Sequence, residues 1–172
     1  MKQVMISAVA ILSVFAFSYS GLAQEKAPKS PAKSTETLID GVNVLVVYGS
    51  PSVREREIWG KLVPYNKVWR TGANEATTIE VHADMEINGK LLPEGKYSIF
   101  TIPTEKSWTL IFNSVWEQWG AYKYDESKDV LRVEATPEKC EMTESMSIRL
   151  DNSQLTIKWE KLKVSVKISK AK

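Results

Sequence analysis

The sequence is poor in the side chains that carry most nucleophilic and metal chemistry, with one cysteine and one histidine in 172 residues. Cys140 has no second thiol in the chain, so an internal disulfide is excluded and the fold must depend on its hydrophobic core. A Ser-His-Asp or Cys-His mechanism would rest entirely on His82, which falls on the polar face of its expected strand. Two soft or imidazole ligands are also too few for zinc. The cluster Asp125, Glu126 and Asp129 lacks the spacing and the glycine of an EF-hand loop and is better read as a solvated acidic turn, so we expect no metal site.

Long apolar runs are equally scarce, and the only one lies at the N-terminus. Lys2 precedes a mostly apolar run over 4–17, and the segment ends in Gly21-Leu22-Ala23. A positive start, a short apolar run and small residues before a cleavage point are the layout of a secretory signal peptide, here residues 1–23. The run is too short to be a stable membrane anchor. We expect an exported protein, periplasmic or extracellular, whose mature form has no membrane span.

An excess of charge of one sign is also missing. Residues 1–23 hold one of the 23 basic residues and none of the 21 acidic ones, which leaves 22 basic against 21 acidic residues in the mature chain. This balance provides no electrostatic surface for nucleic acid, so no nucleic-acid partner is expected. Neither a glycine-rich phosphate loop nor a dinucleotide-binding motif occurs, and we expect no cofactor.

Residues 24–36, with the sequence QEKAPKSPAKSTE, contain no large apolar side chain. A segment of this composition buries too little apolar surface to offset the entropy lost on ordering it. We therefore expect a flexible leader over 24–36, followed by one folded domain over 37–172.

The folded part shows a hydrophobic period of two, which is typical of strands with one buried face. Apolar residues alternate with polar ones in the segments 42–48, 79–85, 108–112, 131–135, 146–150, 155–159 and 164–168, whereas 96–103 is apolar on both faces. Asp40-Gly41 and Asn88-Gly89 are dipeptides suited to tight hairpin turns. No long amphipathic helical pattern occurs. The pattern predicts a single all-β domain, an antiparallel β-sandwich or flattened barrel of about eight to ten strands.

Two long connections depart from this period, residues 49–76 and residues 113–129, and both are rich in aromatic side chains. Loops of this length without regular structure are usually functional or tightly packed. At most each holds a helical turn, for which residues 55–62 are the best place. We expect the two connections to meet at one end of the sandwich.

Three motifs in these regions carry a family resemblance. They are SPSVREREIWGKLVPYNKVWRTGANEATTI, LPEGKYSIFTIP and WEQWGAYKYDESKDVLRV, in this order. The chain resembles a family of exported bacterial proteins known only as domain of unknown function 2911. The resemblance implies a shared scaffold without an assigned activity, and therefore no catalytic residue. Family members more often have Arg in place of Gly49 or Ser50 and Gly in place of Glu55, which implies a difference in ligand if these positions belong to a site.

The connections also contain a constellation of side chains suited to binding. Its members are Arg54, Arg56, Trp59, Tyr65, Trp69, Arg70, Asn74 and Glu75 in the first connection, with Trp116, Gln118, Trp119 and Tyr122 in the second. Guanidinium groups bind carboxylates and phosphates, and aromatic faces cover the apolar faces of ligands such as sugars. In the resulting hypothesis Arg54, Arg56 and Arg70 hold a negative or polar group, Trp69 and Trp119 stack on the ligand, and Asn74 and Glu75 fix its orientation. Trp108 and Trp159 alternate with polar residues and are expected in the core.

We therefore favour non-catalytic binding of a small polar or anionic ligand or a glycan. Three alternatives stay open. In a purely structural account, the arginines pair with Glu57 and Glu75 and pin the connection over one end of the sandwich. Glu57 and Glu75 are also the carboxylate pair of a hydrolase of the glycoside type, the enzymatic alternative. In the third, an envelope assembly protein binds other proteins through an exposed strand edge or an aromatic patch, and the oligomeric state stays open.

Overall fold

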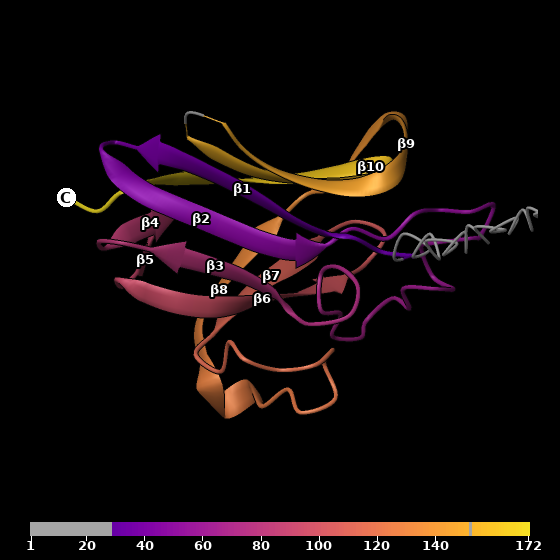
Figure 1. The fold of residues 1–172 in the computed structure, drawn as a ribbon, viewed down its shortest axis with the longest axis horizontal. Helices are drawn as coiled ribbons and strands as arrows, with labels where there is room; N and C mark the ends of the chain where they lie inside the picture. The colour runs from indigo at the N-terminus through magenta and orange to yellow at the C-terminus, as the bar shows by residue number, and fades with distance from the viewer. Residues whose placement is uncertain (1–28, 152) are drawn as a thin grey trace, which may run out of the picture.

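The fold is a sandwich of two antiparallel sheets, in a computed structural model that describes residues 29–151 and 153–172 (Figure 1). One sheet has six strands in the order β1-β2-β3-β6-β7-β8, with the bounds Ala32–Ile39, Val42–Gly49, Thr77–Val81, Gly95–Pro103, Trp108–Asn113 and Asp129–Ala135. The other has the order β5-β4-β10-β9, with the bounds Lys90–Leu92, Met85–Ile87, Gln154–Lys170 and Glu138–Asp151. The predicted all-β sandwich is confirmed. The predicted signal peptide and residues 24–28 of the predicted leader lie outside the described residues.

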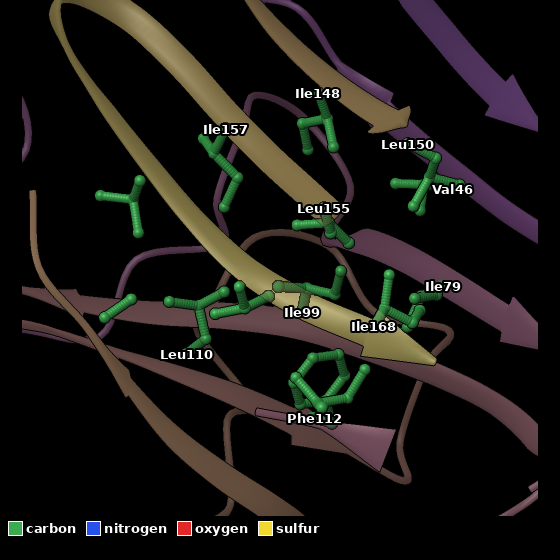
Figure 2. Packing of buried hydrophobic residues seen from close by; sticks show 14 of the residues in the cluster. Val46, Ile79, Ile99, Leu110, Phe112, Ile148, Leu150, Leu155, Ile157 and Ile168 are labelled. Carbon is green, nitrogen blue, oxygen red and sulfur yellow. The ribbon is translucent and has the colours of Figure 1, made fainter. Parts of the chain in front are cut away.

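The core lies between the two sheets and is built by the alternation seen in the sequence. Val46, Ile79, Ile99, Leu110 and Phe112 point inward from the six-stranded sheet, and Ile148, Leu150, Leu155, Ile157 and Ile168 meet them from the other sheet (Figure 2). All ten side chains are buried, and the core they belong to supplies the apolar stabilisation of a fold without a disulfide. Trp108 and Trp159 are each 1% exposed, as their alternation predicted.

Both predicted hairpin dipeptides form tight turns. Asp40 and Gly41 connect β1 to β2 with φ values of 51° and 79°, and Asn88 and Gly89 connect β4 to β5 with φ values of 49° and 76°. Two consecutive residues at positive φ are what a two-residue hairpin turn requires, because its twist then matches that of the strands.

The first strand begins earlier than predicted. β1 starts at Ala32, so residues 32–36 belong to a strand rather than to a leader. Their side chains are mostly exposed and give no apolar signal, but the backbone pairs with β2 from Ala32 opposite Gly49 to Ile39 opposite Val42. Backbone pairing with a tertiary neighbour overrides composition here.

The alternating segment 79–85 is not one strand. β3 ends at Val81 in the six-stranded sheet and β4 begins at Met85 in the other, so residues 82–84 cross between the sheets. Asp84 holds this crossing, because its Oδ1 accepts from Glu94 N at 2.8 Å and its carbonyl accepts from Ala171 N at 3.0 Å.

β10 folds back on itself. Glu160 has a φ of 55°, Ile168 N donates to the carbonyl of Ser153 at 2.8 Å, and Thr156 Oγ1 lies 2.9 Å from Ser165 Oγ. The predicted strands 155–159 and 164–168 are therefore the two halves of one element, lying side by side, and Figure 2 shows the ribbon turning between Ile157 and Ile168.

The outer face of the six-stranded sheet is covered in part by the second connection. Phe100 and Ile111 point outward from β6 and β7, and Ala121 and Tyr124 pack on them in a small second cluster. This explains why 96–103 is apolar on both faces. In Figure 1 the connection lies below this sheet, away from β9 and β10. It holds one 3-10 turn, Glu126–Lys128, whereas residues 55–62 form turns without a helix. No helix in the described part is long and apolar enough to cross a membrane.

Candidate functional site

Two tryptophans of the first connection dock in the core beside two tryptophans of the sheets. Trp59 lies 4.8 Å from Trp108 and 5.9 Å from Trp159 between ring centroids, both edge to face. Trp69 stacks on Trp159 at 5.8 Å with an interplanar angle of 18°. Trp69, predicted to stack on a ligand, thus packs on other tryptophans and is only half-buried.

Backbone bonds return the end of the first connection to the six-stranded sheet. Trp69 and Thr101 exchange two hydrogen bonds, at 2.8 and 2.9 Å, and Thr77 Oγ1 donates to the buried carbonyl of Thr71 at 2.7 Å. Ala73 N donates to the carbonyl of Gly49, at the end of β2. Residues 73–76 are therefore fixed as a wall beside β2 and β3.

Two of the predicted arginines hold the start of the same connection. Arg54 donates from its guanidinium to the carbonyl of Lys29 at 2.8 Å. Arg56 donates to the carbonyls of Val53 and Ser52 at 3.0 and 2.6 Å. Both side chains are exposed and bind backbone oxygens. Within residues 29–151 and 153–172 neither forms the ion pair with Glu57 or Glu75 that the structural account required.

Arg70 lies closer to the second connection. It is half-buried, its guanidinium lies beneath Gly120, and its Nε is buried without a hydrogen-bond partner among the described residues. A buried donor without a partner costs about 1–3 kcal/mol. Because Arg70 belongs to the first connection and Gly120 to the second, Arg70 packs where the two connections meet.

An ion-pair network fixes the far end of the second connection to β8. Arg132 donates to Asp129 Oδ2 at 2.8 Å and to the Tyr124 hydroxyl at 2.8 Å, and it pairs with Glu126 at 3.0 Å. The Tyr124 hydroxyl donates to Asp129 Oδ2 at 2.6 Å, and the buried Asn113 amide donates to Asp129 Oδ1 at 2.8 Å. Burial, followed by the hydrogen bond to Asp129, raises the pKa of Tyr124 from 10.0 to about 12.

This network predicts a loss of stability at high pH. The folded protein holds the Tyr124 proton more tightly than the unfolded chain. The stability that the protonated Tyr124 hydroxyl contributes is therefore fully present below pH 10.0 and is lost as pH rises through about 12. The melting temperature of the wild type should therefore fall more steeply from pH 9 to pH 12 than that of Tyr124→Phe, which has no hydroxyl to titrate. Parallel pH profiles of the two proteins, recorded by circular dichroism, would contradict this assignment.

A groove of about 310 Å³ opens on the outer face of the six-stranded sheet, where the two connections meet. One wall is residues 73–76, the floor comes from β2, β3 and β6, and the other wall is residues 116–118. Its lining residues are Ala32, Val47, Tyr48, Gly49, Ala73, Asn74, Glu75, Ala76, Thr78, Lys96, Trp116, Glu117 and Gln118. The two connections thus meet around one concave surface, but it lies on the outer face of the six-stranded sheet and not at the predicted end of the sandwich.

Two backbone hydrogen bonds join the two walls. Ala76 N donates to the carbonyl of Gln118, and Gly120 N donates to the carbonyl of Asn74, each at 3.0 Å. Between them Glu75 and Trp119 form an antiparallel bridge. Trp119 is 61% exposed, so its ring does not pack in the core, and it follows the lining residue Gln118 in sequence without lining the groove itself.

The polar groups of the groove include an acceptor that is not satisfied. Gln118 Nε2 donates to the carbonyl of Val115 at 2.7 Å, whereas Gln118 Oε1 is buried without a partner in the described part of the chain. Lys96 Nζ lies 4.3 Å from the centre of the Trp116 ring and 3.6 Å from Glu80 Oε2. Lys96 is therefore occupied within the protein.

The predicted site residues thus divide into two groups. Asn74 and Glu75 line the groove, and Trp119 stands beside it. Arg54, Arg56, Trp69 and Arg70 do not line it, and neither does Glu57, the second carboxylate of the hydrolase alternative. Within the described residues, no group of three or more His, Cys, Asp or Glu side chains has the arrangement of a metal site.

The predicted site lacked six polar or aromatic lining residues: Tyr48, Thr78, Lys96, Trp116, Glu117 and Gln118. Trp116 and Gln118 belonged to the wider constellation in the sequence. Lys96 required the pairing of β3 with β6, which sets it opposite Glu80 and so on the outer face. This register is a property of the folded sheet, and no local signal around Lys96 indicates it.

The sequence matches a family model over residues 30–168, and that family is described as Protein of unknown function (DUF2911). The chain belongs to this family. The matched region contains every residue that lines the groove, and two of the three motifs that carry the resemblance supply its walls, residues 73–76 and residues 116–118. No curated protein matches the sequence. No solved structure matches it either.

Proposed function

We propose that this protein is an exported, non-catalytic binding protein whose groove holds a glycan. Export rests on the signal-peptide pattern of residues 1–23. Binding rests on one observation, the groove of about 310 Å³ whose lining combines the aromatic side chains of Trp116 and Tyr48 with carboxylate and amide groups. This size is at the lower end of the range for small-molecule sites.

The chemistry of the walls fits a sugar. Sugars present an apolar ring face and a rim of hydroxyl groups, so they bind where an aromatic ring lies beside hydrogen-bonding side chains. Trp119 supplies an exposed ring, joined by its backbone to Glu75. Glu75, Asn74 and Gln118 supply acceptors and donors on the two walls.

An anionic ligand receives less support from the same geometry. The three arginines proposed to hold it lie outside the groove, and Arg54 and Arg56 bind backbone carbonyls. The one basic residue of the lining, Lys96, is engaged by Glu80 and Trp116.

Titration calorimetry with a panel of ligands tests the proposal. The purified protein should bind at least one class of oligosaccharide, and Trp119→Ala should weaken this binding about tenfold, the equivalent of about 1.4 kcal/mol. Leu91→Ala removes an exposed apolar side chain of β5, on the other sheet, and should leave the affinity unchanged. Binding of inorganic phosphate or citrate, with no heat from any oligosaccharide, would contradict a glycan ligand and support the anionic alternative.

A protein partner is the second candidate, because the exposed aromatic residues lie close together in sequence. Trp116, Trp119 and Tyr122 are 40%, 61% and 83% exposed on one segment. Clustered exposed aromatic side chains are typical of protein interfaces. This candidate predicts self-association or a stable complex that Trp119→Ala and Tyr122→Ala both weaken, observed by sedimentation velocity. A monomer over the whole concentration range that still binds oligosaccharide would count against it.

A further inference from the structure

The acidic side chains that line the groove outnumber the basic ones. Its lining contains Glu75, Glu117 and Lys96. The ammonium of Lys96 is shared between Glu80, at 3.6 Å, and the face of the Trp116 ring, at 4.3 Å. Glu75 and Glu117 are exposed and have no ion-pair partner among the residues that the structure describes. The charge left free in the groove is therefore negative.

Arg54 and Arg70 of the first connection form no ion pair with these carboxylates among the described residues. Arg54 lies at the start of the first connection and is bound to the carbonyl of Lys29. Arg70 packs beneath Gly120 and does not line the groove. An incoming cation would thus meet two carboxylates on opposite walls and no competing free cation in the lining.

The carboxylates and the aromatic rings favour the same kind of ligand. An ammonium group has three donors and no acceptor, and the carboxylates of Glu75 and Glu117 offer acceptors only. Aromatic faces also attract cations, and Lys96 over Trp116 shows this attraction within the protein itself. Trp119, bridged to Glu75, offers a second ring that no lysine or arginine covers among the described residues.

We infer that the groove selects a glycan that carries a free, protonated amine, an amino sugar rather than an acetylated or neutral one. Glu75 and Glu117 hold the ammonium, while Trp119 stacks on the sugar ring. This inference rests on the proposed function, because it specifies which glycan the same groove binds. A groove that binds a cationic ligand also fits the position of Arg54, Arg56 and Arg70 outside its lining.

Three oligosaccharides of equal length test the inference by titration calorimetry. These are a glucosamine tetramer, its fully N-acetylated counterpart and a neutral glucose tetramer, at pH 6, where the amines are protonated. The glucosamine tetramer should bind about tenfold more tightly than the other two, and the preference should shrink as salt rises from 20 to 500 mM, because exposed charges are screened.

Charge-removing variants assign the preference to named residues. Glu75→Gln and Glu117→Gln should each weaken binding of the glucosamine tetramer about threefold, as expected for partly exposed ion pairs. Each of the two variants should change the affinity for the neutral tetramer by less than threefold. Glu57→Gln removes an exposed carboxylate of the first connection that does not line the groove, and it should have no effect.

The outcomes separate this inference from the proposed function. Equal affinity for all three tetramers, or tighter binding of the acetylated or neutral one, would overturn the amino-sugar inference and leave glycan binding intact. Binding of none of these or any other oligosaccharide would overturn the proposed function itself. A preference for glucosamine that survives in Glu75→Gln/Glu117→Gln would overturn the assignment to these carboxylates.

Discussion

Gly49→Ala should destabilise the protein by about 3 kcal/mol or more, the upper range for overpacking in a closely packed site. A Cβ at this position would overlap the carbonyl oxygen of Ala73 and lie 2.9 Å from its carbonyl carbon. Both are backbone atoms, which cannot rotate away as a side chain can. The same Ala73 is held to Gly49 by a hydrogen bond of 3.2 Å, so relief of the overlap would also break that bond. Urea unfolding followed by tryptophan fluorescence measures the loss.

Gly89→Ala is the matched control. Its Cβ would meet nothing within 4 Å, but its φ of +76° is strained for alanine, so the variant measures backbone strain without overlap. We expect a loss of about 1–2 kcal/mol for Gly89→Ala. If Gly49→Ala is no less stable than this control, the first connection is not packed against β2 as described. Because Ala73 forms part of the groove wall, Gly49→Ala should also weaken ligand binding in whatever fraction remains folded.

The sequence was sufficient for the layers of the fold because most strands leave a local pattern in the sequence. Alternation identifies the face of β2 or β7 that is buried, and Asp40-Gly41 identifies a hairpin by the φ values it tolerates. Elements without such a pattern were missed. The turn of β10 at Glu160 contains neither Gly nor Asn, and β1 is held by backbone pairing although its first residues are polar.

The site was predictable to a smaller extent, for a related reason. Composition marked both connections as aromatic-rich departures from the strand pattern, and it brought Asn74 and Glu75, which line the groove, into the candidate set. It could not separate a tryptophan that packs in the core from one that faces solvent. Trp69 and Trp119 both lie outside the alternating strands, and only their neighbours in space, Trp159 and Glu75, distinguish their surroundings.

Trp159→Ala should cost about 3–5 kcal/mol, the range for deleting a buried aromatic side chain. Trp159 is 1% exposed, stacks on Trp69 and meets Trp59 edge to face, so its removal leaves a cavity beneath the first connection. Its Nε1 also donates to the carbonyl of Glu144 at 3.4 Å. Trp159→Phe, which fills part of the space, should recover a substantial part of the loss.

Comparison with Trp119→Ala tests which tryptophans stabilise the fold and which contact a ligand. Trp119→Ala should change the free energy of unfolding by less than about 0.5 kcal/mol, as exposed substitutions usually do, while it weakens ligand binding. Trp159→Ala should do the reverse, with a large loss of stability and nearly normal affinity in the folded fraction, because Trp159 does not line the groove. If both variants lost stability equally, Trp119 would be part of the packing and the groove would lose its proposed stacking residue. The assignment of core and ligand roles therefore depends on the opposite responses of these two variants.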